Sequence, residues 1–186
     1  MQNQMKKHKL AFIDIESTGL DPERHEIIQI GVVVATQEWV DGKPSFQVVE
    51  EFEIKVKPER IEDADKSALK INGYNEADWT EASTLPEAMK IFSDKTADTI
   101  MVAHNVVFDY CFLNKAFYIT GEDNRMHYHK LDTISIAFAK LYLNEDVDRF
   151  SLQYICDHFG IVNEKAHTAL SDSRATFELY QKLMNL

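Results

Sequence analysis

The sequence contains few of the residues that mark specialised classes of protein. Its 186 residues include two Cys, four Pro and six Gly, too few for a disulfide framework or a collagen-like chain. The longest mostly apolar stretch, residues 27–35, is about half the roughly 18 residues that a membrane-spanning helix needs. The basic start of the chain is not followed by a small-residue cleavage site. We therefore expect a cytoplasmic protein with no membrane segment.

Basic residues are scarce as well. Lys and Arg number 20 against 31 Asp and Glu, so the formal net charge is −11. This excess argues against broad, non-specific attraction to nucleic acid, although a site that binds divalent cations would itself add carboxylates. Cys111 and Cys156 lie within apolar patterns, so we expect both to be buried free thiols. The length and the 45% apolar content predict a single globular domain over residues 1–186.

Hydrophobic periodicity predicts strands first and helices later. Residues 9–16, 27–35 and 52–56 have strand patterns that predict an antiparallel unit, and 99–103 is a further short strand. Asp-Gly at 41–42 marks a turn within a longer polar connection. Helical patterns cover 65–71, 84–94, 106–118, 133–143, 151–159 and 169–184. This order predicts an α/β fold with a mixed sheet flanked by helices.

Two acidic residues interrupt the first predicted strand. Asp14 and Glu16 occupy positions that a buried strand would give to Val or Ile. Residues two apart on a strand point the same way, about 6.5 to 7 Å apart, so both carboxylates face one volume. Two like charges against a core cost several kcal/mol unless water or a cation reaches them. The pair therefore indicates either a solvent-exposed strand end or a metal site.

Further polar residues lie at the ends of later predicted elements. Asp109 is in the first turns of the helix that follows strand 99–103, with His104 and Asn105 at the junction. His167 precedes the last helix and Asp172 lies in its first turns, so the two can face one site. Each also has an ordinary explanation, because the aspartates favour the positive helix end and an asparagine can cap a helix. A lone histidine is usually structural.

Taken together, four carboxylates and one histidine are the parts needed for two-metal hydrolysis of a phosphodiester. Hard oxygen ligands suit Mg²⁺ or Mn²⁺, and thiolates are absent from the set. In such a site two ions help to generate hydroxide and stabilise the leaving oxygen, while a histidine can accept the proton of water.

Three segments resemble the DEDDh branch of the DnaQ-like exonuclease superfamily. They are FIDIESTGL at 12–20, AHNVVFD at 103–109 and HTALSD at 167–172. The resemblance implies a ribonuclease H-like fold and the removal of nucleoside 5′-monophosphates from the 3′ ends of single-stranded DNA or RNA. It also implies that His167 is the general base and that four carboxylates bind two Mg²⁺ or Mn²⁺ ions. These carboxylates are Asp14, Glu16, Asp109 and Asp172.

The resemblance implies substrate contacts from the first two segments. Residues of the first segment would touch the terminal nucleotide. Residues of the second segment would shape the path of the neighbouring nucleic-acid strand. Hydroxyls can hold a 3′-hydroxyl or a phosphate, and apolar side chains can stack on bases. For the leucine and the phenylalanine, core packing is the alternative. The set comprises Ser17, Thr18, Leu20, His104, Asn105 and Phe108.

Other readings of the sequence remain open at this point. Asn72-Gly73 stands where many members of the superfamily carry His-Gly, which leaves DNA and RNA equally open as substrates. A non-catalytic module that binds nucleic acid or protein could keep the fold, and a hydrolase of small phosphodiesters could use the same metal site. The sequence identifies no protein partner and no oligomeric state.

Overall fold

A five-stranded mixed sheet forms the centre of the molecule in the computed structural model, which describes residues 5–163 and 166–186. The strand order is β3-β2-β1-β4-β5. The first three strands are antiparallel, whereas β4 and β5 run parallel to β1. This arrangement confirms the predicted α/β fold. The strands are β1 (Leu10–Ser17), β2 (Ile27–Val40), β3 (Lys43–Lys55), β4 (Ile100–Ala103) and β5 (Lys130–Asp132).

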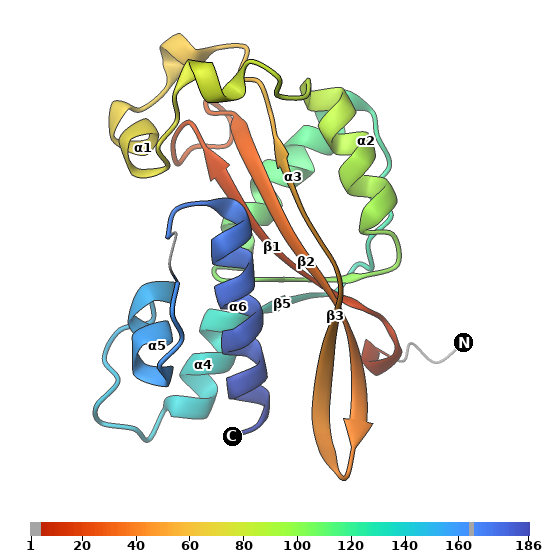
Figure 1. Ribbon diagram of the computed structural model, residues 1–186, viewed down its shortest axis with the longest axis vertical. Coiled ribbons are helices and arrows are strands. Elements are labelled where there is room, and N and C mark those ends of the chain that lie inside the picture. Colours follow the sequence, from red (N-terminus) through yellow and green to blue (C-terminus); the bar gives the residue numbers. More distant parts are fainter. Residues whose placement is uncertain (1–4, 164–165) are drawn as a thin grey trace.

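Helices cover both faces of the sheet. Figure 1 shows α3 behind the sheet and α6 in front of it, with α4 and α5 beside α6. The α-helices are α1 (Lys66–Ile71), α2 (Leu85–Lys95), α3 (Val106–Thr120), α4 (Thr133–Leu141), α5 (Leu152–Phe159) and α6 (Ala169–Met184). The short 3₁₀ helices are η1 (Met5–Lys7), η2 (Ile61–Asp63) and η3 (Glu76–Trp79).

The alternation of side chains along β1 decides where its acidic residues point. Ile13 and Ile15 are buried in the core formed with α2 and α3. Leu10 and Phe12 point to the opposite face and are buried in the core that includes residues of α6. Glu16 continues the Leu10 and Phe12 series, so it lies on the α6 face, where the strand passes beyond its apolar part.

The second and third strands are much longer than the sequence pattern predicts. They pair from Gln29 to Val40 on β2 and join through a two-residue turn at Asp41 and Gly42, both with positive φ. Beyond Ala35, β2 has no partner on β1, so the hairpin projects from the sheet (Figure 1). The expectation of a turn at 41–42 is confirmed, but the longer polar connection expected around it is wrong, because these residues are strand. The pattern failed there because the hairpin is solvated on much of its surface and lacks clean alternation.

Smaller differences concern β5 and one cysteine. The three-residue strand β5 was not predicted, because it is too short to show a period. Cys156 is buried as expected, whereas Cys111 is exposed, so that prediction is wrong. Cys111 lies on the outer side of α3, whose buried residues are Val106, Asp109, Phe112, Leu113, Ala116 and Phe117. In the part of the chain that the structure describes, no helix combines the length and apolar character needed to cross a membrane.

Candidate active site

Three acidic side chains meet at the end of β1. Asp14, Glu16 and Asp172 each offer a carboxylate oxygen, and these oxygens all lie within 4.8 Å of one another. Asp14 and Glu16 are half-buried on the strand, and Asp172 is buried in the first turn of α6. Residues more than 150 positions apart in the sequence are thus brought to one point, as the sequence analysis predicts for these three.

The docking of α6 on β2 places Asp172 beside β1. Gly31 lies opposite Asp14 in the strand register, and a Cβ atom built there would lie 2.1 Å from the backbone carbon of Ala169. The side-chain oxygen of Gln29 accepts a hydrogen bond from the Ala169 amide at 3.1 Å. The Ser173 hydroxyl donates to the Gly31 carbonyl at 2.9 Å. A missing side chain and two hydrogen bonds therefore fix the start of the helix against the sheet.

The fourth predicted carboxylate approaches from the other side of the sheet. Asp109 is buried in the first turn of α3, and its Oδ1 accepts a hydrogen bond from the Ile15 amide at 3.0 Å. It does not belong to the three-carboxylate group defined above. Its charge still raises the pKa of Asp14 and of Glu16, so it lies near enough to act on both.

The site concentrates negative charge in a partly desolvated place. Burial, followed by repulsion from Asp172 and Asp109, raises the pKa of Glu16 to about 8. Burial also raises the pKa of Asp109 to about 8, against the lowering effect of the Ile15 amide. Burial and the three neighbouring carboxylates raise the pKa of Asp14 well above its usual range. Ionised together, these groups need a compensating cation.

His167 lies at the edge of this cluster and is tied to it through its backbone. Its amide donates to Oδ2 of Asp172 at 3.0 Å, and its own φ of 69° is in the left-handed region. The side chain is exposed. Asn163 donates its side-chain amide to Oδ1 of the same aspartate and accepts from the Ser171 hydroxyl at 2.6 Å. Both ends of segment 163–167 are thus bonded to one carboxylate; residues 164–165 are outside the described part of the chain.

The loop after β1 holds the predicted contacts of the first motif. The Ser17 hydroxyl donates to the Gly19 carbonyl at 2.7 Å, and the Thr18 hydroxyl accepts from the Glu26 amide at 2.9 Å. Both hydroxyls are therefore engaged within the loop. Leu20 is 79% exposed, so core packing, the alternative to substrate contact, is wrong for this residue.

The same loop is braced by residues that the motifs do not include. The Asn72 amide donates to the Ser17 carbonyl at 3.0 Å. The ring of His25 packs against Gly19, where a Cβ would lie 2.5 Å from it, and Nδ1 accepts from the Asp21 amide at 3.0 Å. Asn72 thus has a structural contact at the position where the superfamily commonly has histidine.

In the second motif, the His104 side chain is hydrogen-bonded, whereas the Asn105 side chain makes no capping bond. Nε2 of His104 lies 2.8 Å from the Phe150 carbonyl and Nδ1 lies 2.9 Å from the Thr133 hydroxyl, so both ring nitrogens have protein partners. Burial chiefly lowers the pKa of His104, which favours the neutral ring. Asn105 is exposed with φ of 72°, and its side chain does not cap α3. Its role as a cap, one of the two expectations, is therefore wrong.

Asp132 caps the start of α3 in place of Asn105. Phe108 is neither fully packed in the core nor fully exposed for contact with bases. Oδ1 of Asp132 accepts from the amides of Asn105 and Val106 at 3.0 and 3.2 Å. Phe108 is half-buried, packs against the core, and its ring centroid lies 5.1 Å from that of Phe112. One side of the ring therefore remains available at the surface.

Comparison with known proteins decides the family. The model of the RNase_T family, described as an exonuclease family, matches residues 11–180. The chain belongs to this exonuclease family. The match confirms the predicted DnaQ-like exonuclease superfamily.

Relatives of this exonuclease family member include parts of bacterial replication enzymes. The chain is 30% identical over 175 residues to the PolC-type DNA polymerase III of Thermotoga maritima, covering 94% of this chain and 12% of that protein. It is 27% identical over 184 residues to the epsilon subunit of DNA polymerase III of Aquifex aeolicus, covering 99% and 84%. The chain thus spans about an eighth of the PolC-type relatives that it matches.

Solved structures of Exonuclease I share the fold. The E. coli enzyme in complex with a dA16 oligonucleotide has a TM-score of 0.76 at 20% identity, covering 94% of this chain and 40% of that chain. A zinc-bound complex of the same enzyme with single-stranded DNA has a TM-score of 0.77 at 20% identity. This likeness confirms the ribonuclease H-like fold.

The residues that sequence reasoning missed in this exonuclease domain are those that hold the motifs in place. Gly31 inside a β-branched strand was a usable signal, because glycine in a strand often marks a close approach of another backbone. Gln29, Asn163 and Asp132 gave no such signal, since a single polar residue in a strand or loop has many ordinary explanations.

Proposed function

We propose that this chain removes nucleoside 5′-monophosphates from the 3′ ends of single-stranded DNA or RNA, by hydrolysis that depends on two Mg²⁺ or Mn²⁺ ions. Residues 1–186 would form one exonuclease domain. The observation that carries the proposal is the convergence of Asp14, Glu16 and Asp172 within 4.8 Å, with Asp109 acting on the same point.

The donor set fits divalent ions that prefer oxygen. All four side chains are carboxylates, which such ions prefer. The raised pKa values of Asp14, Glu16 and Asp109 reflect negative charge that the protein alone does not neutralise well. When bound there, two divalent ions would supply an activated water and stabilise negative charge on the departing oxygen. Asp14, Glu16, Asp109 and Asp172 would hold them.

His167 is proposed as the general base. Its exposed ring sits on a segment whose amide is bonded to Asp172, so the imidazole is kept close to the carboxylate cluster while it remains accessible to water. A neutral imidazole would accept the proton of the attacking water and return it to solvent.

Substrate contacts are proposed along the rim of the site. The exposed Leu20 and the surface side of Phe108 suit contact with bases, and Asn105 offers an exposed amide. Ser17 and Thr18 are buried and hydrogen-bonded within the loop, so they would act on the terminal nucleotide by holding the loop that presents Leu20. His104 would shape the strand path through Phe150. The E. coli Exonuclease I structure that shares this fold is a complex with a dA16 oligonucleotide. Single-stranded DNA is therefore the first substrate to test. We also propose a cytoplasmic location for the protein.

A 5′-labelled oligonucleotide tests the function directly. We expect stepwise shortening from the 3′ end with Mg²⁺ or Mn²⁺ and none with EDTA, on matched DNA and RNA strands. Asp14→Asn should reduce kcat by at least about 10³-fold, and His167→Ala by about 10²- to 10⁴-fold. Glu145→Gln, a surface change outside the site, is the matched control.

Two results would reject the proposal. Undiminished metal-dependent hydrolysis in both Asp14→Asn and His167→Ala would remove these residues from the chemistry. Binding of the oligonucleotide without cleavage under any metal would support a non-catalytic module instead, and cleavage of chromogenic phosphodiesters alone would support a small-molecule hydrolase.

A further inference from the structure

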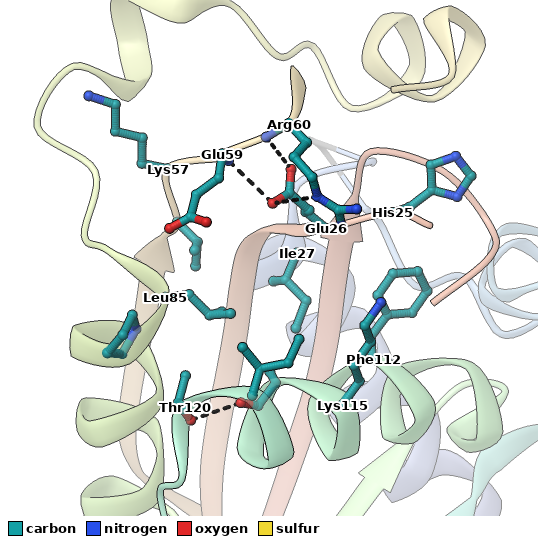
Figure 2. A pocket seen from close by; sticks show the side chains of 14 residues that line it. His25, Glu26, Ile27, Lys57, Glu59, Arg60, Leu85, Phe112, Lys115 and Thr120 are labelled. Atoms are coloured by element: carbon teal, nitrogen blue, oxygen red, sulfur yellow. Dashed lines mark hydrogen bonds and ion pairs between the residues drawn. The ribbon is translucent and has the colours of Figure 1, made fainter. Parts of the chain in front are cut away.

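A separate pocket of about 360 Å³ lies between α2, α3 and the start of β2. Its walls come from α2, α3, the segment before β2 and residues 56–60 (Figure 2). Ile27 contributes to the same core as Ile13 and Ile15, so the pocket opens on the α2 and α3 side of the sheet. The carboxylate cluster lies on the α6 side, so the pocket is no part of the proposed nuclease site.

The inner part of this pocket is apolar. Ile27, Val56 and Phe112 are buried side chains at its base, and Leu85 and Ile119 extend the same surface towards the opening. Ile119 is 59% exposed and adds apolar surface at the opening. The volume lies within the roughly 300–1,000 Å³ of pockets that enclose small molecules.

The pocket lining carries three cationic side chains and two carboxylates: Lys57, Arg60, Lys115, Glu26 and Glu59 (Figure 2). Arg60 comes from the segment after β3 and Lys115 from α3, so these two cations belong to different walls. The carboxylate of Glu26 already accepts from the amides of Arg60 and Glu59 at 2.8 and 3.3 Å. The Arg60 guanidinium lies 3.7 Å from that carboxylate and is 44% exposed. The Lys115 ammonium donates to the carbonyl of Pro22.

We propose that this pocket binds a small amphipathic anion with an apolar body and one singly charged oxyanion. The apolar base would enclose the body, and the oxyanion would lie between Arg60 and Lys115, which keep free donor capacity because each uses only part of its N–H groups. Glu26 is already engaged by Arg60 and by two backbone amides, so a cation between Arg60 and Lys115 would meet two like charges. A wholly apolar ligand would leave both cations to be desolvated without a partner.

The probe is 8-anilinonaphthalene-1-sulfonate, which combines an aromatic body with one sulfonate. Its fluorescence and isothermal titration calorimetry should report saturable binding to one site in the presence of EDTA. In two-dimensional ¹H–¹⁵N spectra, the amides of Ile119 and Thr120 should shift, whereas those of Asp14 and Asp172 should not. Octanoate, an alkyl carboxylate with one charge, serves as the competitor and should displace the probe.

Three variants separate the cations from the apolar base. Arg60→Met with Lys115→Met should weaken binding by about tenfold or more, since both charge-assisted contacts to the oxyanion are lost. Ala116→Leu keeps every charge and fills the base of the pocket, so it should abolish binding while the protein stays folded. Lys70→Met on α1 removes an exposed charge outside the pocket and should bind as the wild type does.

Several outcomes would overturn the proposal. These are non-saturable binding, unchanged affinity in Ala116→Leu, or shifts confined to residues outside the pocket. If the double variant unfolds, Ala116→Leu decides alone. Exonuclease assays are not used in this test, so failure of the pocket and failure of the proposed nuclease activity are distinguishable.

Discussion

Asp172 is held by donors on both of its oxygens. Oδ1 accepts from the side chain of Asn163 and Oδ2 from the backbone of His167. Because Asn163 also accepts from Ser171, a single side chain joins the start of the His167 segment to the first turn of α6. Asn163 would thus orient the proposed metal ligand Asp172 and the proposed base His167 together, although it would touch neither metal nor substrate.

Replacing Asn163 tests this positioning role. We expect Asn163→Ala to lower kcat about tenfold and to weaken Mn²⁺ binding by calorimetry several-fold, because outer-shell partners of ligands typically contribute 10- to 100-fold. Ser171→Ala removes one of the two hydrogen bonds and should have a smaller effect in the same direction. Asn114→Ala, on the surface of α3, is the control. Wild-type Mn²⁺ affinity and wild-type kcat in Asn163→Ala would show that the segment is held by other contacts.

Single residues differ in how well the sequence predicts their place. Asp14 and Glu16 were predictable because charges inside an apolar strand pattern violate a physical rule. Leu20 was not, since an apolar residue in a loop can be buried or exposed without violating one. The role of Asn163 depends on a turn of chain that brings it back to α6, and no local pattern encodes such a contact.

At the scale of elements, two contacts set the geometry of the site: α6 against β2, and the start of α3 against the end of β5. The first depends on Gly31, where the helix backbone occupies the space of a side chain. The second depends on Asp132, whose two oxygens accept hydrogen bonds from the first residues of α3 and α4. Helix bounds followed from period and capping, whereas these contacts between elements did not.

A side chain at position 31 should displace α6. Gly31→Val places a β-branched group into the backbone of Ala169, so we expect about 1–3 kcal/mol of destabilisation in urea unfolding and loss of Mn²⁺ binding, because Asp172 moves with the helix. Gly121→Ala adds a Cβ at a positive φ with no neighbour within 4 Å. It should cost stability through backbone strain alone and leave Mn²⁺ affinity unchanged. A Gly31→Val protein with full metal affinity would contradict this account of the docking.

Asp132 should contribute to stability as an anion. Burial acts to raise its pKa, but the hydrogen bonds from Ser135, Val106 and Asn105 outweigh burial and lower it. A lowered pKa means that this contribution is present above the unfolded-state value of about 3.8 and is lost as the pH falls through the folded-state value. Asp132→Asn should therefore cost about 1–3 kcal/mol at pH 7.

The pH dependence of that loss separates charge from shape. The difference in unfolding free energy between wild type and Asp132→Asn should shrink as the buffer is brought below pH 4. Asp148→Asn is the control, since its contact with Arg149 is 3.9 Å long and fully at the surface. A difference that stays constant between pH 7 and pH 3.5 would assign the effect to packing.

At the scale of the whole molecule, the topology brings the site together. Because β4 lies beside β1, the start of α3 lies near the end of β1. The start of α6 packs against the first part of β2, which pairs with the same end of β1. Strand order of this kind was predictable only as a class, because an antiparallel unit followed by alternating strands and helices is compatible with several orders. The length of the β2–β3 hairpin was not predictable, since its outer part is stabilised by cross-strand pairing on a solvated surface.

The same arrangement makes the stability of the folded chain depend on pH and metal together. Glu16 and Asp109 have pKa values raised from 4.5 and 3.8 to about 8. For acids with raised folded-state values, the stabilisation is fully present below the unfolded-state pKa and is lost as the pH rises through about 8. In EDTA, we therefore expect the Tm to fall by about 5 °C or more between pH 6 and pH 8.5.

Divalent ions should reverse this loss, because ionised carboxylates bind them and binding to the folded state adds to its stability. The rise in Tm on adding Mn²⁺, measured by calorimetry, should be larger at pH 8.5 than at pH 6. Glu16→Gln removes one of the repelling charges, so its metal-free Tm should depend less on pH while its response to Mn²⁺ is reduced. A metal-free Tm that is constant or increases from pH 6 to pH 8.5 would mean that burial and repulsion do not raise the pKa values of Glu16 and Asp109 in the folded chain.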